Sequence, residues 1–456
     1  MYKPYQTPVD RAFPDIETPE PRVSAFMVLM AKLFGRLYLF LFLGIARIFL
    51  RGKRYFFDSF DRALRGKSRC IIAVRHPYGG EPQMLSWYIL FKFRALAKRG
   101  GYTLARAPHT VFVYGYEVVR WGGAVARLVM PRLGAMPVHH TKVDTRGMSR
   151  IYKAITEGPY PLSIAPEGQV SYTAEAIPRL EQGAIRIGFH AAERLQRSGS
   201  DCPVEILPVS AHFRYGSWGK FALKLLIGKI EKYTGLRKKN RAAGNLSLEE
   251  SVLRCREHIL AANERRYGLQ VDTAQPYAER VNAVMDAAMN HAEMVLGLRK
   301  GGGEVIDRMY HLRQICWDRI YLPGTNGLDD FSSVERSIAD LRAGEAWHAG
   351  RHLEVVDFSW YFRNPPPAQD APLHTRIEYV QNLWDFANRT MGGAYANRTN
   401  IFPRCVIFRA APPINLSARL PEYRTDRKAL VRKVMDELKD AYLDCIEKEA
   451  TGDNKD

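Results

Sequence analysis

From residue 70 onward, short apolar runs alternate with longer amphipathic segments. The short runs are typical of buried strands, whereas apolar residues that recur at helical spacing are typical of helices packed on one face. The pattern predicts strands over residues 70–74, 110–114, 161–165 and 204–209, and helices over residues 84–96, 145–156 and 184–194. Because strands separated by helices form layered structures, this part of the chain is expected to be an α/β domain.

The pattern changes after residue 230. Helical periodicity and balanced charge cover residues 246–267, 277–298, 331–345 and 376–390, and no motif stands out among them. A strand is then expected over residues 405–408, followed by a charged helix over residues 425–448. We therefore expect a helical accessory region over residues 230–400.

The N-terminal part contains the most apolar stretch. Residues 1–24 are rich in Pro and polar groups and predict an irregular tail, whereas residues 25–50 are apolar except for Lys32, Arg36 and Arg47. The uninterrupted apolar run is shorter than the ~20 residues of a spanning helix, and its charges argue against a signal peptide. Residues 25–55 are therefore expected to hold a monotopic, membrane-associated helix with snorkelling Lys and Arg side chains. A buried core helix is the alternative.

The charge distribution supports a surface interaction of the N-terminal half. The chain carries a formal charge of +19, and residues 1–230 hold 34 Lys and Arg against 16 Asp and Glu. Such an excess favours either nucleic acid or an anionic membrane as the partner. No nucleic-acid module is recognisable, and residues 51–69 place seven Lys and Arg against two Asp directly after the apolar stretch. Because each such charge adds ~1 kcal/mol on an anionic leaflet, we expect a membrane surface on its cytoplasmic face rather than nucleic acid.

A histidine and a carboxylate lie five residues apart in the sequence RHPYGGEP, residues 75–82. Neither a helix nor a strand brings two side chains together at this spacing. A tight turn does so, and Gly79 and Gly80 supply the backbone freedom for one. We therefore expect Glu81 to reach back to His76 at the C-terminal end of the strand over residues 70–74. An ordinary loop pair, or a pair between Arg75 and Glu81, is the alternative.

Four blocks in this order resemble the motifs of the glycerolipid acyltransferases, the family of 1-acylglycerol-3-phosphate acyltransferase. After RHPYGGEP come LGAMPV (133–138), IAPEGQVS (164–171) and ILPVS (206–210), and LEQGA (180–184) resembles the run that follows the third family block. The strand at residue 405, the PPINLS turn (412–417) and the last helix resemble the end of the same domain. The resemblance implies a layered α/β acyltransferase domain with a central, mostly parallel sheet. Its parts would be residues 56–229 and 401–450, split by the helical insertion.

The resemblance also implies a reaction and its residues. His76 would be the general base and Glu81 its partner, in transfer of an acyl chain from acyl-CoA or acyl carrier protein to a lysophospholipid. The family uses Asp where this chain has Glu81. No nucleophilic Ser or Cys with a neighbouring base is evident in the sequence, which fits direct attack by the acceptor. The resemblance implies Glu167 and Gly168 as substrate-binding residues, and His140, Lys142 and Arg179 are candidate substitutes for phosphate-binding Arg residues of the family.

Two departures from the family pattern leave the acceptor open. The Arg of the third block is replaced by Val170, after Gln169, and the Arg of the second block is replaced by His140. Because Arg is the side chain best suited to a phosphate, a glycerol phosphate acceptor is in question, with His139 as a further substitute ligand. An inactive membrane-tethered scaffold that keeps the fold is the alternative function. The six cysteines lack CxxC spacing and His139-His140 lacks ligand-spaced partners, so no metal or cofactor is expected.

Overall fold

The protein divides into two compact units, each built from two segments of the chain. The computed structural model describes residues 8–15, 20–116, 118, 123–139, 144–242, 244, 246–325, 327–390, 393, 401 and 403–452. One unit comprises Met1–Glu17 and Ser217–Ile401, and the other comprises Thr18–Gly216 and Phe402–Asp456. We call them the helical unit and the sheet unit.

A mostly parallel sheet forms the centre of the sheet unit. Within the described residues its strands run in the order β2 (Ile45–Arg51), β9 (Arg404–Ala410), β7 (Val204–Tyr215), β3 (Arg69–Val74), β6 (Leu162–Ile164), β4 (Val111–Gly115) and β5 (Met136–Val138). The pair β7–β9 is antiparallel, as is β10 (Ile414–Asn415) on β7, and the other neighbours are parallel. The expected α/β domain with a mostly parallel sheet is confirmed.

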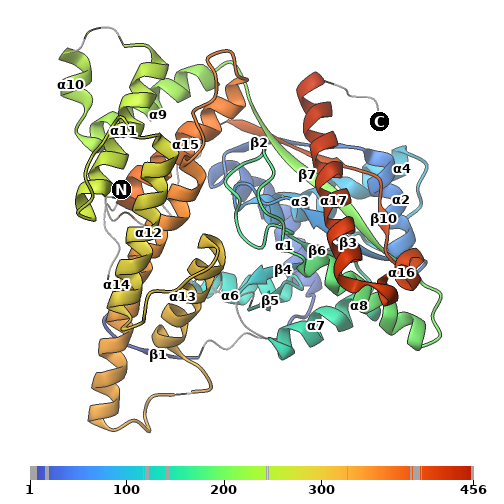
Figure 1. Ribbon diagram of the computed structural model, residues 1–456. Coiled ribbons are helices and arrows are strands. Elements are labelled where there is room, and N and C mark those ends of the chain that lie inside the picture. Colours follow the sequence, from blue (N-terminus) through green and yellow to red (C-terminus); the bar gives the residue numbers. More distant parts are fainter. Residues whose placement is uncertain are drawn as a thin grey trace. The chain divides into compact units, whose positions relative to one another are not determined.

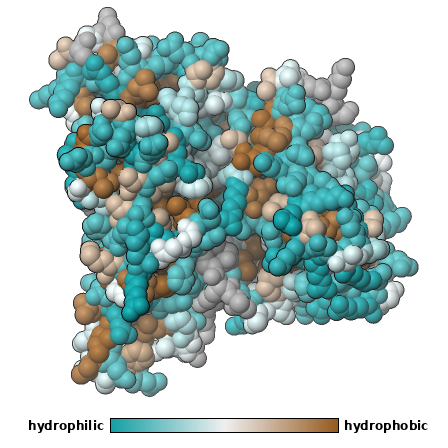
Figure 2. Space-filling model, in the orientation of Figure 1, coloured by the Kyte–Doolittle hydropathy of each residue, from teal (hydrophilic) through white to brown (hydrophobic). Residues whose placement is uncertain are grey.

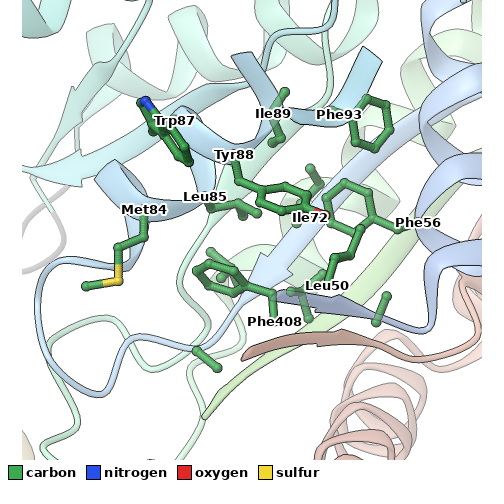
Figure 3. Close-up of a cluster of buried hydrophobic side chains, with 14 of the residues drawn as sticks. Leu50, Phe56, Ile72, Met84, Leu85, Trp87, Tyr88, Ile89, Phe93 and Phe408 are labelled. Atoms are coloured by element: carbon green, nitrogen blue, oxygen red, sulfur yellow. The ribbon is translucent and has the colours of Figure 1, made fainter. Parts of the chain in front are cut away.

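Helices cover both faces of this sheet. In β3, Cys70, Ile72 and Val74 face one apolar core, and Ile71 and Ala73 face the other, because successive side chains of a strand alternate. The first core is closed by α2 (Lys53–Leu64), α3 (Glu81–Tyr88), the π-helical turn η1 (Ile89–Phe93) and α4 (Arg94–Arg99). Figure 3 shows Leu85 and Tyr88 of α3 directed toward Ile72, Phe56 and Phe408.

The second core lies under α7 (Thr145–Thr156), α8 (Gly183–Arg197), α16 (Leu420–Thr425) and α17 (Arg427–Thr451). Figure 1 shows α17 in front of β7 and β3. The Tyr442 hydroxyl of α17 donates to the carbonyl of Ala73 at 2.8 Å, which fixes the last helix on the end of β3. Burial on both faces explains why residues 70–74 are a continuous apolar run rather than an alternating one.

The N-terminal helix is shorter than the sequence predicted. Helix α1 (Ala25–Leu41) ends before Gly44, whose φ is +66°, and residues 45–51 form β2 instead of continuing the helix. The prediction of one membrane-associated helix over residues 25–55 is therefore wrong in its second half. Most apolar side chains of α1 are exposed and only Leu39 is buried, so the buried core helix is also wrong. Within the part of the chain that the structure describes, no helix has both the length and the apolar character to span a bilayer.

The helical unit contains α9 (Gly219–Thr234), α10 (Arg237–Ala242), α11 (Leu248–Arg266), α12 (Tyr277–Val295), α13 (Val305–Ile320), α14 (Ser333–Phe362) and α15 (Leu373–Thr390). A short parallel pair joins β1 (Phe13–Pro14) to β8 (Tyr321–Leu322), so residues 8–15 belong to this unit rather than to an irregular tail. The expected boundary after residue 229 falls inside α9, whereas the structure divides the chain after Gly216.

The surface of the helical unit is mainly polar in the view of Figure 2. Brown side chains gather over the first turns of α14, where Val334, Ile338 and Leu341 are exposed. Helices α12 and α14 run side by side (Figure 1) and bury a row of Ala and other apolar residues between them.

Candidate active site

The turn after β3 brings Glu81 back to His76. Strand β3 ends at Val74, Gly79 adopts a φ of +89°, and Glu81 begins α3. Glu81 Oε2 lies 2.8 Å from His76 Nδ1, as the sequence predicted. The same carboxylate accepts the backbone N–H groups of Tyr78 and Gly79, each at 2.9 Å. A single buried carboxylate therefore holds both the turn and the imidazole.

These contacts fix the orientation and tautomer of the imidazole. Because a carboxylate only accepts hydrogen bonds, the Nδ1–H of His76 donates to Glu81 and Nε2 keeps its lone pair. The His76 side chain is 19% exposed, whereas that of Glu81 is fully buried. The imidazole is thus reachable from solvent and the carboxylate is not.

The environment raises the pKa of His76. Burial lowers this pKa, but the hydrogen bond and the charge of Glu81, with the charge of Glu167, outweigh burial and bring the pKa above its ordinary value. Both carboxylates stabilise the imidazolium, which is the form that a general base reaches when it accepts a proton.

A second buried ion pair holds the backbone of the same loop. Arg75 is fully buried, and its Nε donates to Glu167 Oε1 at 3.1 Å. Glu167 Oε1 also accepts the backbone N–H of His76 at 3.3 Å, and the His76 carbonyl accepts the N–H of Ser171 at 3.0 Å. Arg75 is thus paired with Glu167. The alternative pair between Arg75 and Glu81, which the sequence allowed, does not form.

Arg75 also anchors the segment that follows the third block. Its Nη1 donates to the carbonyl of Ala174 at 2.8 Å, and its Nη2 donates to those of Thr173 and Ala176 at 2.9 and 2.7 Å. The first and third blocks are therefore in contact, and a Cβ placed on Gly79 would lie 3.6 Å from Val170 Cγ2. This proximity puts Val170, which stands at the family's Arg position, beside the histidine turn.

The predicted substrate residues have different surroundings. Glu167 is 3% exposed and faces Arg75, so its place favours a positioning role, and its contact with an acceptor stays a prediction. Gly168 is exposed with a φ of +71°, and Arg179 is exposed with its Nε 3.8 Å from Glu181 Oε1. His140 and Lys142 lie outside the described residues.

His139 lies at the same carboxyl end of the parallel strands as His76, but it follows a different strand. It follows β5, and its ring stacks on that of Tyr116, which follows β4, with centroids 4.0 Å apart. Its backbone N–H donates to Asp144 Oδ2 at 2.9 Å. Since β3, β4, β5 and β6 are parallel, His76, Tyr116, His139 and Glu167 all follow the carboxyl ends of strands, where open α/β sheets bind ligands. The sequence analysis missed Tyr116 and Asp144, which only the strand pairing brings into view.

A second histidine–carboxylate pair, which the sequence did not reveal, joins His212 of β7 to Glu175 of the loop between β6 and α8. Ser210 Oγ is 2.7 Å from His212 Nε2, and His212 Nδ1 is 3.3 Å from Glu175 Oε2. Ser210 therefore stands beside a base. Ser210 and His212 are both 0% exposed, however, so no substrate reaches this serine.

Burial and the neighbouring charges have opposite effects on the pKa values of His212 and Glu175. Burial lowers the pKa of His212 despite the nearby Glu175. Burial alone would raise the pKa of Glu175, but His212 and Arg214 lower it to about 2. Because Glu175 lies in the segment whose carbonyls Arg75 binds, we assign this pair to support of the active-site loop.

No protein-family model matches the chain, and no curated protein matches it. Within the described residues, no group of three or more His, Cys, Asp and Glu side chains is arranged to hold a metal ion.

Proposed function

We propose that the protein is an O-acyltransferase in which His76 is the general base and Glu81 its partner. The observation that carries the proposal is the 2.8 Å contact between a partly exposed imidazole and a buried carboxylate at the end of a parallel strand. The order of the four sequence blocks supports an acyl thioester as donor and a lysophospholipid, such as 1-acylglycerol-3-phosphate, as acceptor.

The proposed reaction needs no covalent enzyme intermediate. His76 Nε2 removes the proton of the acceptor hydroxyl while the oxygen attacks the thioester carbonyl carbon. The tetrahedral intermediate then collapses, the C–S bond breaks, and the imidazolium returns its proton to the leaving thiolate. The products are an ester and a free thiol, of CoA or of the carrier protein. Direct attack is favoured because Ser210, which does lie beside a base, is buried.

The exposed face of α1 supports a membrane surface as the site of the reaction. Phe26, Leu29, Leu33, Leu37 and Leu41 recur at helical spacing and are 49–66% exposed. The opposite face packs on α3 so closely that a Cβ on Gly35 would lie 2.6 Å from Trp87 Cδ1. We propose that α1 inserts shallowly into the cytoplasmic leaflet and that the adjacent basic residues bind its headgroups.

The decisive experiment compares His76→Ala with the wild type on a panel of substrates. Purified protein in detergent is given acyl-CoA or acyl carrier protein with lysophosphatidic acid, zwitterionic lysolipids or neutral lipid alcohols, and products are detected by mass. Because a positioned base contributes about 10²- to 10⁴-fold, His76→Ala should lower kcat/KM by that factor. Its circular dichroism should be unchanged, since the side chain is partly exposed.

The matched control is His190→Ala, which removes an exposed histidine of α8 in the same unit and should keep full activity. A folded His76→Ala protein with wild-type turnover would refute the base assignment. Failure of the wild type to consume any thioester would favour the inactive scaffold.

A further inference from the structure

Three histidines meet on adjacent helices of the helical unit, in a part of the chain that the proposed reaction does not use. His291 belongs to α12, and His348 and His352 lie one turn apart on α14. The ring centroids of His348 and His352 are 5.0 Å apart, and those of His291 and His352 are 5.6 Å apart. His348 is exposed and the other two are half-buried, so solvent reaches the cluster.

The Nε2 atoms of two of these rings are in hydrogen-bond contact. The Nε2 atoms of His348 and His352 are 3.4 Å apart. Two imidazole nitrogens bound to one tetrahedral Zn²⁺ lie about 3.3 Å apart, because each Zn–N bond is about 2.0–2.1 Å long. The pair is thus already spaced as two ligands of a single ion.

The remaining nitrogen of His352 has the partner that a metal-binding histidine requires. His352 Nδ1 lies 2.9 Å from the hydroxyl of Tyr267, which can accept the Nδ1–H, so that the Nε2 lone pair is the one that faces His348. His291 Nδ1 similarly donates to the carbonyl of Ala287 at 2.9 Å, which leaves its own Nε2 lone pair free.

We propose that His348 and His352 bind a divalent transition metal ion of the Zn²⁺ class through their Nε2 atoms. Water completes the coordination, since the described residues offer no third ligand arranged around the same ion. Tyr267 orients His352, and His291 packs beside it without being a ligand. Imidazole nitrogens suit Zn²⁺, Cu²⁺ and Ni²⁺, whereas Mg²⁺ and Ca²⁺ require oxygen ligands, so the site discriminates against the latter.

The test is a Zn²⁺ titration of the full-length protein, purified without a polyhistidine tag and freed of metal with a chelator. Calorimetry should show a Zn²⁺ site in the wild type that Mg²⁺ does not occupy. Loss of even an outer-shell partner weakens a metal site about 10- to 100-fold, so His348→Ala and His352→Gln should each weaken Zn²⁺ binding by at least about tenfold. Co²⁺ added in place of Zn²⁺ should give a visible absorption band in the wild type that both variants lack.

The matched control is His311→Ala, which removes an exposed histidine of α13 in the same unit and should bind Zn²⁺ as the wild type does. Equal Zn²⁺ affinity in His348→Ala and the wild type would overturn the proposal, as would a wild type that binds no Zn²⁺. Because His348 is exposed, its loss should leave the circular dichroism unchanged, so a change in binding reports on the ligand itself.

Discussion

At the scale of single residues, Glu81 has two tasks at once. Its carboxylate closes the turn through the N–H groups of Tyr78 and Gly79, and it binds the imidazole of His76. A side chain that performs only the second task would be free to rotate, whereas here one backbone N–H donates to each carboxylate oxygen and holds the group that His76 contacts. The extra methylene of Glu relative to Asp is therefore accommodated by the geometry of the turn.

The titration of His76 gives a prediction about pH. A base acts when neutral, so kcat/KM should fall as the pH drops through the pKa of His76, which lies above its ordinary value. Glu81→Gln removes the charge that raises this pKa, so the pKa should fall and the acid limb of the pH profile should move to lower pH. At neutral pH the rate should also fall, by about 10²-fold or more, because the imidazolium loses its stabilising charge.

The measurement is kcat/KM between pH 5 and 9 for the wild type, Glu81→Gln and Glu157→Gln. Glu157 is exposed at the end of α7, so its variant should keep the wild-type profile. An acid limb that stays in place, or moves to higher pH, in Glu81→Gln would contradict the assignment of Glu81 as the group that sets the pKa.

The sequence predicted the His76–Glu81 contact but not the ion pair behind it. The contact is local, and Gly79 and Gly80 mark the turn that makes it. Arg75 and Glu167 are far apart in sequence, and their pairing depends on β3 and β6 being neighbours in the sheet. Only the strand order supplies that information.

At the scale of elements, the local hydrophobic pattern did not predict β2, because this strand depends on a partner that is distant in sequence. Residues 45–51 pair with β9, more than 350 positions away, and within their own neighbourhood they continue the apolar character of α1. Arg36 makes the change of direction possible, because its guanidinium donates to the carbonyls of Ile45 and Ala46 at 2.8 and 2.7 Å. By contrast, α7 was predicted over the residues where it occurs, since its apolar face is regular and Asp144 caps it.

The packing of α1 on α3 predicts the effect of a single methyl group. A Cβ on Gly35 would lie 2.6 Å from Trp87 Cδ1, and a rigid indole cannot yield as a flexible chain end would. Overpacking of this kind costs about 1–3 kcal/mol, which outweighs the gain of up to about 1 kcal/mol in helix propensity. Gly35→Ala should therefore lower the free energy of unfolding.

Gly183→Ala is the matched control, because a Cβ on Gly183 at the start of α8 meets no atom within 4 Å. Urea denaturation followed by tryptophan fluorescence should place the midpoint of Gly35→Ala below that of Gly183→Ala. Equal midpoints would mean that α1 is free to shift away from Trp87.

At the scale of the whole molecule, the proposed membrane association combines net charge with an exposed apolar helix. In that proposal the formal charge of +19 provides long-range attraction to anionic surfaces, and the exposed side chains of α1 provide short-range apolar contact. Electrostatic attraction is screened over about 10 Å at 0.1 M salt, whereas apolar insertion is not. The two contributions can therefore be separated by salt.

Vesicle flotation should reveal both contributions. The wild type should float with anionic vesicles at low salt and less so as NaCl rises. Because burying a leucine contributes about 1.5–3 kcal/mol, Leu33→Asp should lower the partition coefficient about tenfold or more at every salt concentration. Leu443→Asp, on the exposed face of α17, should float as the wild type does.

If Leu33→Asp floated with vesicles as well as the wild type does, the insertion of α1 would be contradicted. If the protein instead bound DNA with a steep salt dependence and did not float with vesicles, nucleic acid would be favoured as the partner of the positive charge.

The place of β9 inside the sheet has a consequence for synthesis on the ribosome. β9 separates β2 from β7, so the edge of β2 that it will cover has no neighbour until residues 404–410 emerge. At about 5–20 residues per second, the chain between them takes about 20–70 s to translate. Throughout that interval the β2 segment of the nascent chain keeps an unpaired strand edge, which makes early binding by a chaperone advantageous for this protein.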